Sequence, residues 1–418
     1  MKTTAVRLYG ANDLRVESFD LPKIGSRECL MHVLSDTMCA STYKAVLQGP
    51  AHKRVPEDVA EHPVIVGHEM CGELIQVGED LTDQWSVGQR VVIQPALKLD
   101  NGHDPGYSYS NIGGNSIYAV VPEIVLERGC LVPFNGDAFY KGSLVEAIGC
   151  VLRGFKGMYH TDYTNYRRTD GVRIGGSCVI LGGAGPMGLA AAELAISYGK
   201  CGTVVVTDLS QERLNYAQNA CSPEKAKQAG VELHFVNVSN MKDPVQELKA
   251  LVCGGFDDAF VMVPVAGLVT QAEELLGTDG CLNFFAGPAV HQLPGAINLY
   301  RVHYDGIHLL GTAGSIPEDT VDVIHLMEDG TLDPSGMISH IMGLRAVPEA
   351  MFAMKTPNGA KKVCYNDLDI PCIALADLPM RGETDPLYRE LAELVKANHG
   401  RWSPEAEAVL LKKAPRIH

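Results

Sequence analysis

Hydrophobic residues in the first 145 positions recur in short alternating runs separated by glycine, proline, asparagine and aspartate. Examples are TTAVRLYG, CLMHVLSD, PVIVGHEMCGELIQVG and QRVVIQPAL. Alternation at every second position is the period of a strand with one buried face. Residues 98–116 interrupt the runs with a loop rich in glycine, asparagine, aspartate and tyrosine. The pattern therefore predicts a β-rich segment.

The pattern changes near residue 144, where LVEAIGCVLRGFKGMYH takes helical spacing. From residue 176 onward, apolar strands alternate with helices, beginning with the strand SCVILGG, the helix PMGLAAAELAISYG and the strand TVVVTDL. This alternation predicts a parallel sheet covered by helices.

After about residue 312 the pattern is mixed again. EDTVDVIHLMEDG and PEAMFAM have helical spacing, whereas KKVCYNDL reads as a strand. The final segment, from TDPLYRELAELV to the end, predicts two amphipathic helices. Ser403 is the expected N-cap of the second helix and Pro404 its first residue.

Length, composition and charge narrow the class of protein. A chain of 418 residues predicts two or three domains, and a formal net charge of −15 argues against nucleic acid as a partner. The N-terminal residues lack the apolar core of a signal peptide, and no stretch reaches the length of a membrane span. Twelve isolated cysteines without a CxxC pair suit reduced thiols. We therefore expect a cytoplasmic protein.

A glycine-rich turn lies between an apolar strand and an alanine-rich helix in CVILGGAGPMGLAAAELA. Glycines at such a turn let the backbone approach a pyrophosphate, whose charge the helix N-terminus favours. A tight turn without a ligand is the alternative. The residues expected to contact a dinucleotide here are Gly183, Gly185, Pro186, Met187 and Gly188.

The next strand ends at Asp208, twenty residues after Gly188, where the dinucleotide fingerprint places an acid. Its carboxylate would accept hydrogen bonds from the ribose hydroxyls and would repel a 2′-phosphate. We therefore predict NAD rather than NADP as the cofactor. Arg213, on the helix that follows, is a further predicted cofactor contact.

His68 and Glu69 stand side by side within an otherwise strand-like run, and Cys39 lies 29 residues upstream of His68. Cysteine, histidine and glutamate are all zinc ligands, and a catalytic zinc takes three protein ligands with one open position. Glu146, where the β-rich segment meets the first helix, is a further candidate. Each of these residues taken alone has an ordinary structural interpretation.

From residue 1 to about 380, the chain resembles the zinc alcohol/polyol dehydrogenases, a group of the medium-chain dehydrogenases/reductases. The resemblance is carried by Gly67-His68-Glu69-x-x-Gly72 followed by Gly78, by VGQRV and by ISHIMGL, with Leu81 as a mild departure. It implies an α/β fold of two domains. A GroES-like β-rich catalytic domain would comprise 1–147 and 313–418, with a C-terminal helical extension. A Rossmann domain with a doubly wound parallel sheet would comprise 148–312.

The resemblance also implies roles for single residues. Cys39 and His68 would be zinc ligands, and either Glu69 or Glu146 would be the third. Ser41 would relay the substrate proton, which makes Ser41 and Glu69 the expected catalytic residues. Two positions depart from the family pattern. Thr42 replaces the aspartate that usually orients the histidine, and Ala147 replaces a proline. Residues 94–116 contain no cysteine, so only one zinc per chain is expected.

A narrower resemblance, to L-sorbose 1-phosphate reductase and its relatives, rests on STYKAVLQGPAHKRVP, VIQPAL, GYSYSNIGG and HGRWSPEAEAVLL. It implies reversible hydride transfer between NAD(H) and a secondary alcohol or ketone of a sugar or polyol, phosphorylated or not. Homodimers or homotetramers are what the family implies. The basic residues Lys44, His52, Lys53 and Arg54 could hold a sugar phosphate, with a solvated loop as the alternative.

Two other functions stay open at this point. One is a zinc-free reductase of the same superfamily. The other is a nucleotide-binding sensor that has lost catalysis, which the departures at Thr42 and Ala147 keep open.

Overall fold

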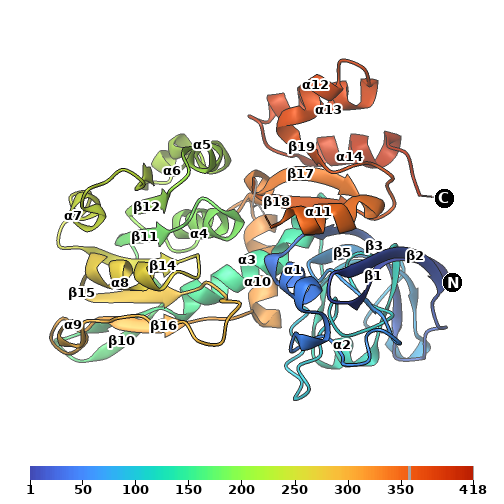
Figure 1. Cartoon of the computed structure of the whole chain (residues 1–418), viewed down its shortest axis with the longest axis horizontal. Helices are drawn as coiled ribbons and strands as arrows, with labels where there is room; N and C mark the ends of the chain where they lie inside the picture. Colours follow the sequence, from blue (N-terminus) through green and yellow to red (C-terminus); the bar gives the residue numbers. More distant parts are fainter. Residues whose placement is uncertain (356–358, 418) are drawn as a thin grey trace. The chain divides into compact units, whose positions relative to one another are not determined.

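The computed structural model describes residues 1–355 and 359–417, and its chain forms two compact units (Figure 1). The first unit consists of Met1–Glu146, Ile316–Glu328 and Ile338–His418, and the second of Ala147–Ser315 and Asp329–Met337. Among the described residues, none of the helices combines the length and the apolar character that crossing a bilayer requires.

The first unit contains the β-rich segment predicted from the sequence. A three-stranded sheet has the order β2-β1-β4, and a larger sheet follows the path β19-β17-β18-β3-β5-β6-β8, with β7 also paired to β3. The strands are β1 (Lys2–Gly10), β2 (Asp13–Asp20), β3 (Cys29–Thr37), β4 (Val64–Ile65), β5 (Met70–Val77), β6 (Arg90–Ile93), β7 (Tyr118–Val121), β8 (Leu131–Pro133), β17 (Ile338–Gly343), β18 (Lys361–Tyr365) and β19 (Ile373–Ala374).

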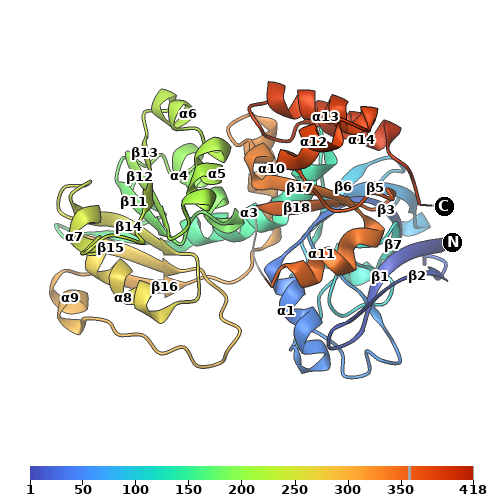
Figure 2. The ribbon, with the colours of Figure 1, turned by 45° about the horizontal axis from the view of Figure 1, so that its top comes forward.

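The larger sheet joins segments from the two ends of the chain. Strand β18 pairs antiparallel with β3, with Val363 opposite Thr37. Figure 2 shows β17 and β18, in orange, beside β3 and β5. Strand β5 packs one face into the core, and Cys71 on this strand is fully buried, as predicted. Gly72 is required beside it, because a Cβ there would lie 1.9 Å from the carbonyl oxygen of His32.

The helices of the first unit include the two predicted at the end of the chain. The Ser403 hydroxyl accepts a hydrogen bond from the amide of Ala406, which confirms Ser403 as the N-cap. Helix α3 begins in this unit and continues into the second. The helices are α1 (Ala40–Gln48), α2 (Glu123–Glu127), α3 (Phe139–Gly157), α10 (Pro317–Glu328), α11 (Val347–Ala353), α12 (Leu378–Arg381), α13 (Pro386–Ala397) and α14 (Pro404–Lys413).

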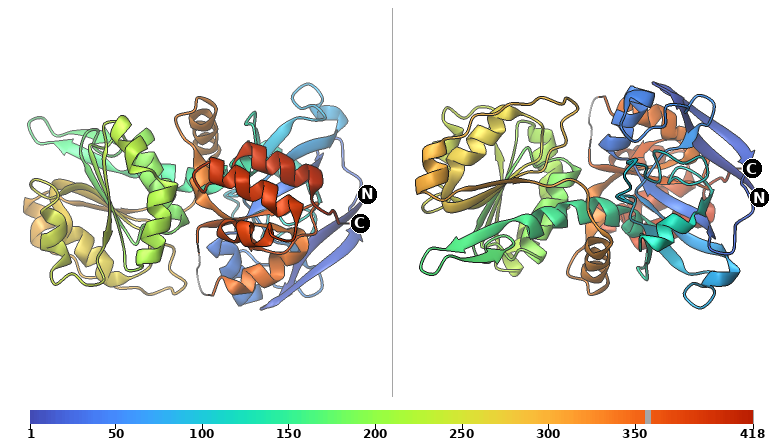
Figure 3. Two further views of the ribbon diagram at one scale, coloured as in Figure 1. Left: turned by 90° about the horizontal axis from the view of Figure 1, so that it is seen from above. Right: turned by 90° about the horizontal axis from the view of Figure 1, so that it is seen from below.

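The second unit holds a six-stranded parallel sheet in the order β13-β12-β11-β14-β15-β16, with helices on both of its faces (Figure 3). This is the doubly wound arrangement, and the strand order reverses between β11 and β14. The predicted alternation of strands and helices is thereby confirmed. The elements are β11 (Ser177–Leu181), α4 (Pro186–Ser197), β12 (Thr203–Asp208), α5 (Gln211–Ala220), α6 (Pro223–Gln228), β13 (Glu232–Asn237), α7 (Pro244–Lys249), β14 (Phe256–Val261), α8 (Ala266–Leu275), β15 (Leu276–Phe284), α9 (Leu299–Tyr304) and β16 (His308–Gly311).

Two details differ from the sequence-based expectation. The helix predicted through residue 160 ends at Gly157, and an antiparallel hairpin follows, β9 (Tyr159–Asp162) with β10 (Arg167–Asp170). Residues 329–337 group with the second unit, whereas the sequence predicts that they belong to the first domain with the rest of 313–418. Part of the reason is local, because the Tyr216 hydroxyl donates to the carbonyl oxygen of Gly336 at 3.0 Å.

Candidate functional site

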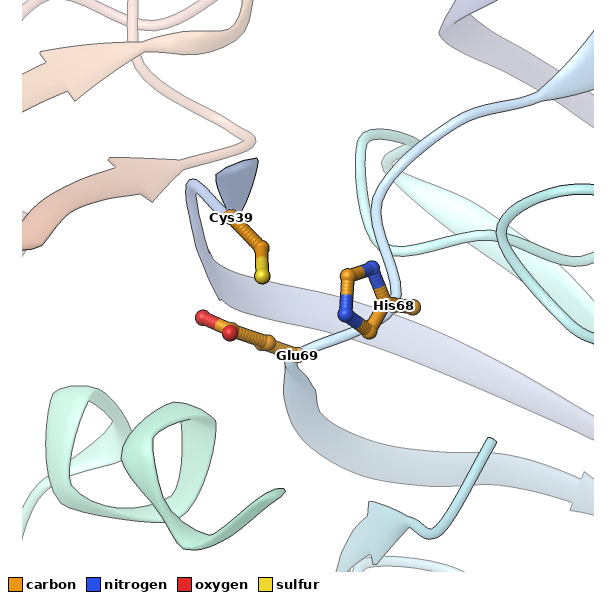
Figure 4. A group of neighbouring side chains, drawn as sticks. All are labelled: Cys39, His68 and Glu69. Atoms are coloured by element: carbon orange, nitrogen blue, oxygen red, sulfur yellow. The ribbon is translucent and has the colours of Figure 1, made fainter. Parts of the chain in front are cut away.

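Three candidate metal ligands converge in the first unit (Figure 4). One ligand atom from each of Cys39, His68 and Glu69 lies within 4.8 Å of the other two. Cys39 lies between β3 and α1, whereas His68 and Glu69 lie between β4 and β5. The preceding Gly67 has φ +92°, and a Cβ there would lie 2.8 Å from the Asp36 carboxylate. Glycine at this position therefore allows the turn that presents His68.

His68 is oriented by a hydroxyl group. The Thr42 Oγ1 lies 2.9 Å from Nδ1 of His68, and both side chains are buried. A hydrogen bond at Nδ1 leaves Nε2 as the atom available to a metal ion. The sequence left open which residue orients this histidine, because Thr42 replaces the aspartate of the family pattern. In the structure, the Thr42 hydroxyl is the hydrogen-bond partner of Nδ1.

The charges around His68 favour its protonated form when no cation is nearby. Burial lowers the pKa of His68, but Cys39, Glu146 and Glu69 together raise it to about 9. The same negative groups that stabilise a proton on the ring would stabilise a metal cation.

Glu69 has two partners that sequence reasoning missed. Its carboxylate accepts hydrogen bonds from the ammonium of Lys361, at the start of β18, and lies within hydrogen-bond distance of the Thr37 hydroxyl. Lys361 is 2% exposed, and although burial lowers its pKa, Glu69 and Cys39 raise it. In the sequence, Lys361 is one of two lysines that open a predicted strand, and no local signal connects it with Glu69.

Glu146 reaches the same cluster from another element. It lies in the first half of α3, and its Oε2 lies 3.9 Å from Nε2 of His68. Its side chain is 12% exposed. Both carboxylates predicted as the third ligand are therefore close to the cluster, and the carboxylate of Glu69 is bonded to the Lys361 ammonium.

Ser41 and Tyr107 line the cluster next to the cysteine and the histidine. The Ser41 Oγ lies 3.1 Å from the Cys39 sulfur and 2.8 Å from the Tyr107 hydroxyl. The Tyr107 ring packs on His68, with 4.9 Å between ring centroids. Tyr107 is buried, and burial raises its pKa well above the usual value. Sequence reasoning placed Tyr107 only in a loop and assigned it no role.

Two of the predicted basic residues, Arg54 and His52, lie against the Tyr107 ring. The Arg54 guanidinium lies 4.9 Å from the centre of the Tyr107 ring and pairs with Asp104 at 2.8 Å. The His52 ring lies nearly parallel to the Tyr107 ring at 6.0 Å. Burial lowers the pKa of His52 to about 4, with further lowering by Arg54, Lys53 and Lys44. All four basic groups are thus close enough to interact.

A pocket of about 370 Å³ opens beside Arg54. Its lining includes the cations Lys53, Arg54 and Lys98 together with the acids Asp100 and Asp104. The loop that was predicted over 98–116 supplies most of these residues. Lys98 was not predicted as a site residue.

The glycine-rich turn in the second unit has the predicted strand–turn–helix form. Gly185 is the N-cap of α4, and Pro186 and Met187 are its first residues. A Cβ on Gly188 would lie 2.1 Å from the carbonyl oxygen of Gly183, so the turn and the helix touch backbone to backbone. The amides at the start of the helix are left without helical partners, as an anion site requires.

Asp208 ends β12, and 8% of the residue is exposed. Its Oδ1 accepts a hydrogen bond from the Ser210 amide at 3.1 Å, and its Oδ2 lies 4.0 Å from Arg213. The Arg213 guanidinium also lies 3.0 Å from where a Cβ on Gly185 would stand. The structure therefore brings together the predicted residues of the turn, Asp208 and Arg213.

Two family models match the chain. The model described as zinc-binding dehydrogenase matches residues 186–329, and the model described as alcohol dehydrogenase GroES-like domain matches residues 25–128. The predicted GroES-like and Rossmann fold is thereby confirmed.

Curated relatives match the chain over nearly its whole length. Mannitol-1-phosphate 5-dehydrogenase of Aliivibrio fischeri is 40% identical, over 98% of this chain and 98% of its own length. L-sorbose 1-phosphate reductase of Klebsiella pneumoniae is 40% identical, over 99% of this chain and 98% of its own length. Among solved structures, 2R,3R-butanediol dehydrogenase from Bacillus subtilis has the same fold, with a TM-score of 0.71 and 23% identity. That match covers 87% of this chain and 100% of the other.

Proposed function

The chain belongs to the zinc-binding alcohol/polyol dehydrogenases, and we propose from this premise that it interconverts a secondary alcohol and a ketone of a sugar phosphate with NAD(H). The enzyme class, the need for zinc and the use of a nicotinamide cofactor follow from the family. One observation carries the proposal beyond the family. Cys39, His68 and a carboxylate converge in a largely buried cluster, and a pocket lined by Lys53, Arg54 and Lys98 contains Arg54, which lies over Tyr107.

The donor set fits a zinc ion. Thiolate, imidazole and carboxylate are the ligands zinc takes, and Nε2 of His68 faces the cluster because Thr42 engages Nδ1. We assign Cys39, His68 and Glu146 as the ligands. Glu69 is the weaker candidate, since the Lys361 ammonium on its carboxylate would repel a cation. Glu69 would then balance the charge of Lys361. It would also be close enough to take the place of Glu146 as a zinc ligand.

Zinc held there would supply Lewis-acid polarisation of an alcohol or carbonyl oxygen, and the nicotinamide would accept or donate the hydride. The residues of the chain supply the proton path. Ser41, 3.1 Å from the Cys39 sulfur, is placed to take the proton of a substrate hydroxyl beside the cluster. The Tyr107 hydroxyl, 2.8 Å from Ser41, is its hydrogen-bond partner on the side of the basic residues.

NAD is the cofactor we propose, with contacts from the glycine-rich turn, Asp208 and Arg213. The support is that Asp208 ends its strand, with its Oδ2 4.0 Å from Arg213, at a position where a carboxylate disfavours a 2′-phosphate. Arg213 beside Gly185 would offset the pyrophosphate charge.

A phosphate on the substrate would be recognised by the basic residues around Tyr107. In a chain of net charge −15, the lining of this pocket carries three cations, Lys53, Arg54 and Lys98, against the two acids Asp100 and Asp104. Arg54 connects that pocket with the metal cluster, since its guanidinium lies over the ring whose hydroxyl contacts Ser41. Both relatives at 40% identity carry a sugar or polyol phosphate in their names, which supports the proposal.

Two further proposals concern the whole molecule. A homodimer or homotetramer is supported by the position of β16 at the edge of its sheet among the described residues, where Leu309 is 53% exposed, and by the exposed aromatic side chains of α9. A cytoplasmic location is supported by the cysteines, all twelve of which lie among the described residues and form no disulfide.

The test is a screen of polyols, ketoses and their phosphates with NAD(H) and NADP(H), followed by the absorbance of the reduced cofactor. We expect turnover of a ketose phosphate with NADH. In Arg54→Gln, KM for the phosphorylated substrate should rise roughly tenfold, as the loss of a charge-assisted hydrogen bond predicts. Lys23→Gln, a change of charge at an exposed site, should behave as wild type. Equal KM values for phosphorylated and unphosphorylated substrates would contradict the phosphate site.

A further inference from the structure

The end of the chain delivers a buried carboxylate to the start of α3, the helix that carries Glu146. Glu407 on α14 is 3% exposed. Its Oε1 accepts a hydrogen bond from the Phe139 amide at 2.6 Å, and its Oε2 accepts one from the Tyr140 amide at 2.9 Å. The first amides of a helix have no partner within the helix, and the helix dipole favours a negative group there. Glu407 thus caps α3 from a segment more than 260 residues away.

Glu407 also contacts the strand that positions Glu69. The Tyr365 hydroxyl donates to Oε2 of Glu407 at 2.8 Å, and the Trp402 indole donates to the Tyr365 hydroxyl at 2.8 Å. Tyr365 is the last residue of β18 and Lys361 the first, so their side chains point to the same face of the strand. The Glu407 carboxylate is therefore hydrogen-bonded to α3, which carries Glu146, and to β18, which carries Lys361.

Helix α3 is held tightly enough for its first turn to determine where Glu146 lies. The Ser35 hydroxyl donates to the Phe139 carbonyl at 2.9 Å, and the Thr37 hydroxyl lies 2.9 Å from the Ser143 carbonyl. A Cβ on Gly142 would lie 2.3 Å from the Cys71 sulfur, so the helix contacts β5 directly. Glu146 follows Phe139 by seven residues, two helical turns, and projects from the same side.

We propose that Glu407 is a positioning residue for the metal centre. By capping α3 and holding β18 through Tyr365, it fixes the distance between Glu146 and Nε2 of His68. The proposal rests on the metal site proposed above. The residues matched by the two family models, 25–128 and 186–329, do not include α14.

The hydrogen-bond donors around Glu407 hold its buried carboxylate in place. Burial raises its pKa to about 7, while the Tyr140 amide, the Tyr365 hydroxyl and the Phe139 amide lower it. These donors compensate part of the cost of burying the carboxylate.

Cobalt binding to the metal-stripped full-length protein tests the proposal, because the visible absorption of Co²⁺ reports both affinity and ligand geometry. Glu407→Gln keeps the size of the side chain but presents an amide N–H to one of the two helix amides. We expect roughly tenfold weaker Co²⁺ binding and a shifted absorption band, as for the loss of other outer partners of metal ligands. Tyr365→Phe should change both in the same direction by less.

Glu405→Gln, at an exposed site on the same helix, is the matched control and should bind Co²⁺ as wild type does. Wild-type affinity and spectrum in Glu407→Gln, however far its melting temperature falls, would overturn the proposal and leave Glu407 a structural cap. If Glu407→Gln does not fold, Tyr365→Phe decides by the same readout. Failure of the wild-type protein to bind Co²⁺ would instead overturn the proposed metal site itself.

Discussion

The metal cluster of the first unit and the glycine-rich turn of the second are built in opposite ways. The turn and its acid come from one continuous stretch, 177–208, in which a strand, a turn, a helix and a second strand follow each other. The cluster draws on Cys39, His68, Glu146 and Lys361, which come from four separate segments. The turn can therefore be predicted from local sequence, whereas the cluster exists only through the tertiary fold.

The two regions also differ in how they would hold a charged ligand. The turn offers backbone amides at a helix N-terminus, where glycine permits close approach. The cluster offers buried ionisable side chains that balance one another, with Lys361 against Glu69 and His68 between carboxylates. A change in one region should therefore leave ligand binding in the other intact.

Cys39→Ala should have the largest effect on turnover. Loss of a zinc ligand removes the Lewis acid, and we expect kcat to fall at least roughly a thousandfold, the equivalent of several kcal/mol. NADH binding, followed by fluorescence, should stay at the wild-type level because the turn is untouched. Loss of NADH binding in this variant would show that the two regions are not independent.

The two carboxylates of the cluster should differ in their contributions. We expect Glu146→Gln to weaken zinc binding by roughly a hundredfold, whereas Glu69→Gln should weaken it by about tenfold. The reason is that Lys361 already occupies the Glu69 carboxylate. Zinc dissociation constants from competition with a chelator give the comparison, and the reverse order would make Glu69 the third ligand.

Gly188→Ala tests the independence of the two regions by altering the glycine-rich turn instead of the metal cluster. Its Cβ would lie 2.1 Å from the Gly183 carbonyl oxygen, so the turn must open and NADH should bind roughly 10- to 100-fold more weakly. Gly267→Ala, at a helical site with open space around it, is the matched control. Zinc content should be unchanged in both variants, and a loss of zinc in Gly188→Ala would contradict the expected independence.

Whether a feature could be predicted from the sequence depends on how far apart its interacting residues lie along the chain. The fold, the glycine-rich turn and Asp208 are set by local patterns of strand, turn and helix. The pair Lys361–Glu69, the ring of Tyr107 on His68 and the cap from Glu407 depend on which segments the fold brings together. Thr42 lies between these cases, because its position was evident but its bond to Nδ1 of His68 was not.

Thr42→Val tests that bond. Valine has the shape of threonine without the hydroxyl, so His68 should lose its partner at Nδ1 and zinc binding should weaken roughly tenfold. Thr42→Ser restores a hydroxyl and should recover most of the affinity. Equal zinc affinity in wild type and Thr42→Val would mean that packing alone orients the ring.

The second unit contains a buried cluster of charged side chains. Of the changes predicted here, we expect its effect on stability to be the smallest. His160 lies against Asp258 at 3.1 Å, with Asp279, Arg173 and His308 around the pair. Burial lowers the pKa of His160, but the hydrogen bond and charge of Asp258 raise it above 6.5 overall. A raised histidine pKa contributes stability that is present below pH 6.5 and is lost as the pH rises through the folded-state value.

The melting temperature should therefore fall as the pH rises above 6.5, and His160→Asn should reduce this dependence. Zinc affinity of the first unit, measured at one pH, should be equal in wild type and His160→Asn. A pH dependence of melting that is the same in both proteins would remove His160 as its source.

The most direct test of the central claim is turnover of a ketose phosphate with NADH by metal-stripped protein, before and after zinc is returned. We predict that turnover is lost on stripping and restored by one zinc per chain, while NADH binds equally well in both forms. Unchanged turnover in the metal-stripped protein would contradict the account and favour a zinc-free reductase. Zinc and NADH binding without turnover of any ketose or polyol would favour a sensor.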